Sequence, residues 1–227
     1  MDWQAFLLTL KLATVTTAIL LAVCIPLAAW LALGRARALA LIEAAASLPL
    51  ILPPTVLGFF LLVLLGPRTA VGRGIATVIG HPLAFSFDGL VVGSVIYSLP
   101  FALQPLVAGF RAVPAPLLDA ARMLGASPSR LVRTILVPLA APSLVVAVVL
   151  SFLHTVGEFG VVLMLGGDIP GATRTLSILL YNQVENFDYA AAMRTAGMLV
   201  LFSLAALVFI YSRTRGQFGA GQERSRG

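Results

Sequence analysis

The sequence predicts an all-α, polytopic membrane protein with about five transmembrane helices, or six at most. Of its 227 residues, 59% are hydrophobic and only 11% are charged, about half the charged fraction of a soluble domain. Several apolar runs reach roughly 18 residues or more, the length that spans a hydrocarbon core. No soluble domain of useful size fits between these runs. Residues 1–227 are therefore predicted to form a single transmembrane domain in a cell membrane.

The net charge does not indicate a nucleic-acid-binding protein. The formal charge is +6 and the pI is near 10.4, but the arginines lie between apolar runs, as membrane topology requires. The single Cys24 lies inside such a run, which excludes a disulfide framework or a CxxC pair.

The first span is predicted from Leu12 to Leu33, with Pro26 as a kink. A cleaved signal peptide is the alternative. However, the chain begins with Asp2 rather than a basic cluster, and the run exceeds the roughly 7–15 residues of a signal-peptide core. Because Arg35 and Arg37 follow this span, the N-terminus is expected outside and the arginines inside.

The second span is predicted from Ser47 to Leu65 and the third from Gly89 to Phe110. Each contains internal prolines, which survive at membrane depth only inside protein or beside a watery cavity. Residues 66–88 are expected outside the cytoplasm with at most one short helix. In the third span, Ser94 and Ser98 are four residues apart, a spacing that allows close helix approach.

The fourth span is predicted from Pro142 to Leu165. His154 and Glu158 are four residues apart and are therefore expected on one helix face. A polar outer loop follows, in which Thr175–Glu185 is expected to form a surface helix. The fifth span is predicted at 192–211, followed by a cytoplasmic tail at 213–227.

The basic residues favour an N-out, C-in topology. Ten lie in the expected cytoplasmic segments and five in the outer ones. The cytoplasmic set is Arg35, Arg37, Arg111, Arg122, Arg130, Arg133, Arg213, Arg215, Arg224 and Arg226.

A polar, basic segment from Asp119 to Pro138 interrupts the apolar blocks. Leu117–Leu124 is predicted to be a short helix that ends at a left-handed Gly125. Ser127 and Pro128 then have the N-cap and N1 signature of a second helix. An ordinary basic loop is one interpretation; the other is a docking element, with Ala120 and Ala121 giving a flat face.

The spacing of this segment resembles the loop signature of bacterial ABC-importer membrane subunits, with Asp in place of the more usual Glu and Val137 in place of Leu. In that family the loop, here about 111–140, holds a coupling helix that docks on the ATPase subunit. The matching positions are Asp119, Ala120, Ala121, Gly125, Ile135 and Pro138.

The resemblance extends over nearly the whole chain to permeases of molybdate ABC importers. It is carried by L-P-P-T-V-L-G from Leu52, G-E-F-G from Gly157 and G-x-I-P-G-x-T-x-T-L from Gly167. Tungstate and sulfate or thiosulfate permeases are alternatives, since the anions are alike in shape. The resemblance implies a type I permease in the bacterial inner membrane, acting as a homodimer or, alternatively, a heterodimer. Its implied partners are cytoplasmic ATPases and a periplasmic or surface binding protein.

The candidate pathway or gate residues are the prolines of span two and small polar groups, which suit a hydrated oxyanion better than fixed charges do. Glu158 is expected to make a structural hydrogen bond and to orient helices or a gate, with direct contact to the substrate as the alternative. The set is Pro53, Pro54, Thr55, Gly58, Ser94, Ser98, Thr155 and Glu158.

The sequence gives little indication that this chain is an enzyme. Lys11 is the only lysine and lies near no P-loop, and His81 and His154 have no neighbours at metal-ligand spacing. We therefore expect no ATPase site, catalytic residue, metal or cofactor in this chain. A secondary carrier using Glu158 and His154, an assembly protein and an intramembrane hydrolase remain as other classes.

Overall fold

The computed structural model describes residues 2–34, 36 and 38–223, and these form helices without any strand. The elements are α1 (Trp3–Leu33), α2 (Ala38–Ser47), η1 (Leu48–Leu50), α3 (Pro54–Leu65), α4 (Ala70–Ile79), α5 (Phe87–Arg111), α6 (Ala115–Met123), α7 (Pro128–Leu131), η2 (Val132–Leu136), α8 (Val137–Leu139), α9 (Ala141–Gly157), α10 (Gly160–Gly166), α11 (Leu176–Glu185) and α12 (Tyr189–Glu223).

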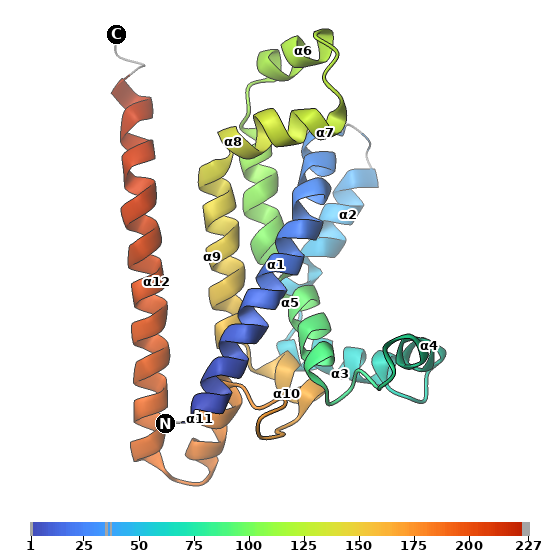
Figure 1. The fold of residues 1–227 in the computed structure, drawn as a ribbon, viewed down its shortest axis with the longest axis vertical. Coiled ribbons are helices and arrows are strands. Elements are labelled where there is room, and N and C mark those ends of the chain that lie inside the picture. Colours follow the sequence, from blue (N-terminus) through green and yellow to red (C-terminus); the bar gives the residue numbers. More distant parts are fainter. Residues whose placement is uncertain (1, 35, 37, 224–227) are drawn as a thin grey trace.

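A bundle of long helices forms the body of the protein. Helix α1 packs against α5 and α9, which also pack against each other. Figure 1 shows α6 to α8 at one end of this bundle and α3, α4, α10 and α11 at the other. Helix α12 runs along one side and contacts mainly α11 and α9. It ends on the side of α6, whereas α1 begins at the opposite end, beside α11 (Figure 1).

Three helices of the described chain are long and apolar enough to cross a membrane. They are α1, α5 and the part of α12 up to Phe209, and each of two bent helix pairs can supply one more span. The prediction of an all-α polytopic protein is confirmed, and five spans is the upper count.

The predicted second span is not one helix. Helix α2 with η1 and helix α3 differ in direction by 108°, and residues 51–53 separate them. Two consecutive prolines explain the break: Pro53 precedes a proline and so disfavours helical backbone, and Pro54 begins α3 at N1. The apolar run and the irregular backbone at its prolines agree with the prediction, and the helical part before the break begins earlier than predicted, at Ala38.

The predicted fourth span is also interrupted. Helix α9 ends at Gly157, Glu158 is extended with φ −66° and ψ 131°, and α10 begins at Gly160. The expectation that His154 and Glu158 share a helix face was therefore wrong. Glycines on both sides of the break lower the helix propensity of this stretch, which favours its interruption.

Other predicted elements are confirmed with shifted ends. Helix α4 is the one helix of the predicted outer segment at 66–88, and α11 coincides with the predicted surface helix. The last helix is longer than predicted, at 189–223. Four arginines of the predicted cytoplasmic set lie outside the described residues: Arg35, Arg37, Arg224 and Arg226. The side chains of Arg213 and Arg215 also lie outside what the structure describes.

Helices α7, η2 and α8 form one helical segment across the end of the bundle, which then bends by 82° into α9. Its middle part, Val132–Leu136, is a π-helix. Leu118, Leu131 and Leu136 are buried in the same hydrophobic cluster as Phe110 of α5. The polar segment is thereby attached to the membrane-spanning bundle through its apolar side.

Candidate functional site

The polar segment has the two local motifs that its sequence predicts. Gly125 has φ +77°. Its N–H donates to the carbonyl oxygen of Arg122 (2.9 Å), and the N–H of Ala126 donates to that of Ala121 (3.0 Å). This pair of bonds is a Schellman motif, which requires a left-handed residue at C′. Ser127 then accepts from the N–H of Arg130 at 3.3 Å and caps α7.

The exposed face of α6 carries a larger apolar area than the sequence analysis recognised. Met123 and Leu124 are 89% and 88% exposed at its tip, beside an ion pair between Asp119 and Arg122 (3.0 Å). Both apolar residues directly precede the helix-ending glycine. That position was the signal that they project beyond the helix rather than into the core.

The predicted docking residues do not share one face. Ala120 and Pro138 are exposed, whereas Ala121 and Ile135 are partly buried against the core cluster. The flat face expected of the two alanines is therefore formed by Ala120 alone. Tight packing of α6 on the bundle accounts for Ala121.

A chain of polar side chains joins α5 to α9 within the bundle. Ser98 Oγ lies 2.9 Å from His154 Nδ1 and 3.1 Å from Thr155 Oγ1, and Thr155 donates to the Ser151 carbonyl oxygen at 2.9 Å. A hydroxyl has one proton to donate, so Thr155 accepts from Ser98. Ser98 must then accept from Nδ1, which fixes neutral His154 as the Nδ1–H tautomer. The Nε2 atom is left as a hydrogen-bond acceptor.

Aromatic rings hold the His154 side chain in place. Phe101 stacks on it with centroids 3.8 Å apart, and Tyr97 lies at 4.7 Å. This sequence-distant cluster brings the predicted residues Ser98 and Thr155 together. It also includes His154, which the sequence analysis had paired with Glu158 instead.

Glu158 lies at the break between α9 and α10 and is 3% exposed. Within the described part of the chain neither of its carboxylate oxygens makes a hydrogen bond of ordinary geometry, and the Ser94 hydroxyl, also predicted, lies close to Glu158 without making one either. A buried polar group without a partner is costly. Glu158 is therefore the predicted residue whose need for hydrogen bonds is least satisfied within a single chain.

The predicted residues of α3 lie on two sides of that helix. Gly58 is buried against α10, and a Cβ there would lie 2.8 Å from Met164 Cβ. The reciprocal contact is made by Gly160 with Pro54 and Thr55. Pro53 and Thr55 are exposed in this chain. The predicted set thus divides into a packed part and an accessible part.

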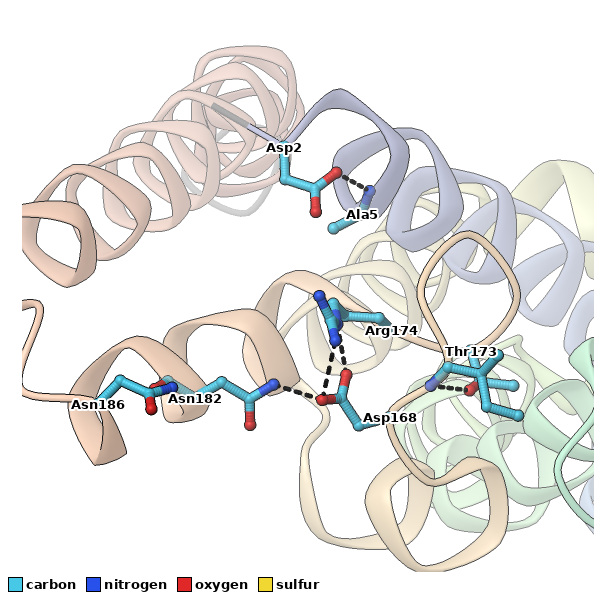
Figure 2. A network of polar contacts seen from close by, with 8 residues as sticks. Asp2, Ala5, Asp168, Thr173, Arg174, Asn182 and Asn186 are labelled. Atoms are coloured by element: carbon cyan, nitrogen blue, oxygen red, sulfur yellow. Dashed lines mark hydrogen bonds and ion pairs between the residues drawn. The ribbon is translucent and has the colours of Figure 1, made fainter.

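A polar network orders the loop between α10 and α11 (Figure 2). This loop lies at the end of the bundle opposite α6 (Figure 1). The Arg174 guanidinium pairs with Asp168 through Nε and Nη2, and Asn182 donates to the same carboxylate at 2.6 Å. The hydrogen bonds that Arg174 donates to the Asp168 carboxylate raise the pKa of Arg174. Asp168 thereby neutralises the Arg174 cation, a residue that the sequence analysis did not single out.

The loop is also fixed to the first helix. The N–H of Leu176 donates to Thr9 Oγ1 at 2.9 Å, and both groups are buried. No group of three or more His, Cys, Asp or Glu side chains suited to a metal ion occurs in the described ranges.

Comparisons with known proteins identify relatives over most of the chain. The family described as "Binding-protein-dependent transport system inner membrane component" matches residues 24–215. The molybdenum transport system permease protein ModB of Azotobacter vinelandii is 48% identical over 96% of both chains. ModB of Escherichia coli K12 is 35% identical over 81% of this chain and 80% of its own.

Two solved structures have the same fold. A chain of a bacterial ABC transporter involved in the import of the acidic polysaccharide alginate has a TM-score of 0.75 at 18% identity, covering 93% of this chain and 78% of that one. The inward-facing MetNI methionine ABC transporter has a TM-score of 0.73 at 18% identity, covering 95% of each chain.

Proposed function

Because this chain belongs to the family of binding-protein-dependent transport system inner membrane components, we propose that it is the permease subunit of an ATP-driven molybdate importer. The observation that carries the proposal is its likeness, along almost the full length, to molybdenum transport permeases. The all-helical, multi-pass fold and the exposed helical segment at one end agree with this role. The chain acts without an ATPase site of its own.

Two copies of the chain form a homodimer around the path of the anion. Each chain carries one docking segment, so two chains are needed to engage two ATPase subunits. The unpartnered oxygens of Glu158 and the exposed side of α3 support a path between the two copies, because both would then face water or the second chain. The residues proposed to line or gate this path are Pro53, Pro54, Thr55, Gly58, Ser94, Ser98, Thr155 and Glu158.

The docking segment, within residues 111–140, receives the ATPase on the cytoplasmic side. Asp119, Ala120, Ala121, Gly125, Ile135 and Pro138 shape it, and the exposed Met123 and Leu124 add apolar contact area. The end of α12 lies on this side and the start of α1 on the other, which supports an N-out, C-in orientation in the bacterial inner membrane. An outer binding protein delivers the anion to the loops beside α10 and α11.

The test is ATP hydrolysis by the protein reconstituted with its candidate ATPase and oxyanion-binding protein. Molybdate, tungstate and sulfate are titrated separately through the binding protein. Stimulation by molybdate at the lowest concentration supports the proposal. Stimulation by sulfate alone would assign the chain to the sulfate permeases, and failure to assemble with any ATPase would reject the docking assignment.

Gly125 allows a sharper test of the docking segment. A side chain at this glycine meets open space within the chain, so Gly125→Asp costs only the left-handed backbone strain, about 1 kcal/mol or less for Asp. We expect an inserted, folded protein that no longer couples ATP hydrolysis to uptake. Gly125→Asn is the matched control, because it has the same shape and backbone tolerance without the charge. Normal uptake in the Asp variant would contradict the docking role.

A further inference from the structure

Two side-chain bridges connect α2 to α5 at the end of the bundle that carries the docking segment. The Arg111 guanidinium donates to both carboxylate oxygens of Glu43, at 3.1 Å and 2.7 Å. Below it, Gln104 Nε2 donates to Ser47 Oγ at 2.6 Å. Glu43 and Ser47 are one turn apart, and Gln104 and Arg111 are two turns apart, so each pair lies on one face of its helix. The bridges therefore form two successive links along one contact.

The Arg111–Glu43 link is informative because of where its two residues lie in the chain. Arg111 is the last residue of α5, and the docking segment begins directly after it. Glu43 lies on α2, which is followed by η1 and then by the break at residues 51–53. Helix α2 and η1 pack against α5, whereas α3, beyond the break, packs mainly against α10. The link thus joins the root of the docking segment to one side of a break between two differently packed helices.

The chemistry of the pair favours a geometric role over a stabilising one. The side chains of Arg111 and Glu43 are 48% and 23% exposed, and ion pairs open to solvent add little to stability. A two-point contact between guanidinium and carboxylate nevertheless fixes both distance and orientation. A lysine at position 111 could supply the positive charge but not this two-point contact.

We propose that Arg111 and Glu43 are positioning residues that transmit movement of the docking segment to α2. This inference rests on the proposed function as an ATP-driven permease. When the ATPase subunits move the segment after Arg111, the link carries α2 and η1 along with α5. The chain then flexes at 51–53, between η1 and α3, and moves α2 relative to the pathway residues Pro54 and Gly58.

The experiment uses the full reconstituted importer with Glu43→Gln, Arg111→Gln, Arg111→Lys and the charge swap Glu43→Arg/Arg111→Glu. Complex assembly, ATP hydrolysis and oxyanion uptake are measured on each. The matched control is Asp88→Asn, which changes an exposed contact between His81 Nε2 and the Asp88 carboxylate (3.1 Å) at the other end of α5.

The single Gln variants are expected to assemble and hydrolyse ATP, while uptake per ATP falls about two- to tenfold. Arg111→Lys is expected between them and the parent, and the swap is expected to recover most of the loss. The control is expected to match the parent. Unchanged uptake per ATP in both Gln variants would overturn the proposal, as would a swap no better than the single variants.

A second measurement separates this inference from the choice of substrate. Cys24 is replaced by Ser, and Leu52→Cys places the only thiol at the break, where its labelling rate is compared with and without ATP. A change on ATP addition that disappears in the Glu43→Gln background supports the link even if no tested oxyanion is imported. A change that persists in that background would overturn it.

Discussion

Replacing Gly58 by alanine places a methyl group where α3 meets α10. The new Cβ would lie 2.8 Å from Met164 Cβ and 3.0 Å from the Cα of Val161. Carbon atoms prefer separations of about 3.5–4.0 Å, so α3 must move away by several tenths of an ångström or more. Overpacking of this kind costs about 1–3 kcal/mol.

Gly74→Ala is the matched control for this variant. Gly74 is also inside a helix, α4, and a Cβ there meets nothing within 4 Å. Both substitutions gain the same helix propensity, about 1 kcal/mol, so their difference isolates the contact with α10. We expect Gly58→Ala to be about 1–3 kcal/mol less stable than Gly74→Ala.

The assay uses the sole cysteine of the chain. Cys24 is fully buried, so a thiol-reactive fluorescent dye reports unfolding of the detergent-purified protein. The expected difference in melting temperature is about 2–4 °C for each kcal/mol. Equal melting temperatures for the two variants would refute the packing of α3 on α10 through Gly58.

Three further outcomes are expected. Leu124→Ser leaves the melting temperature unchanged, because this side chain is exposed, but weakens ATPase binding about tenfold in a co-purification titration; equal binding would exclude Leu124 from the docking surface. Asp168→Asn removes the neutralising charge beside Arg174 and lowers the free energy of unfolding by about 1 kcal/mol. This loss is expected to shrink in high salt. An unchanged stability would show that the pair does not stabilise the fold. Glu158→Gln replaces a buried carboxyl by an amide of the same shape. The melting temperature is expected to stay the same or rise, with a gain in stability of at most about 3 kcal/mol. A clear drop would reveal a cationic partner for Glu158 in the proposed dimer.

Signals confined to a few neighbouring residues were sufficient to predict local structure. The left-handed Gly125 and the cap at Ser127 were predicted because each conformation depends on the residue itself and its immediate neighbours. The apolar runs likewise indicated the membrane-spanning class, since hydropathy over a window needs no tertiary information.

Breaks inside apolar runs were harder to predict. Around Glu158 the apolar composition continues on both sides, so the run resembled one helix, although Gly157 and Gly160 flank an interruption. The double proline at 53–54 indicated irregular backbone, but the size of the bend depends on which helices pack against each half.

Long-range pairings could not be predicted from one sequence. Arg111 and Glu43 are separated by 68 positions, and Ser98 and His154 by 56. Such pairs depend on helix crossing and rotation, which periodicity does not specify. The division of α3 into a packed and an accessible side has the same origin.

The π-helix at Val132–Leu136 links the number of residues in this segment to the direction in which α6 points from the bundle. A π turn holds one residue more than an α turn. Loss of one residue there would restore α geometry with the preceding residues on their present faces, whereas an unbroken α-helix of the same length would rotate everything before it by about 100° relative to α9. The burial of Leu131 and the outward direction of α6 would then be incompatible. Among relatives, a single-residue gap at this point would therefore preserve the direction of α6, whereas an unbroken α-helix of unchanged length would point it elsewhere, even where every residue of α6 is the same.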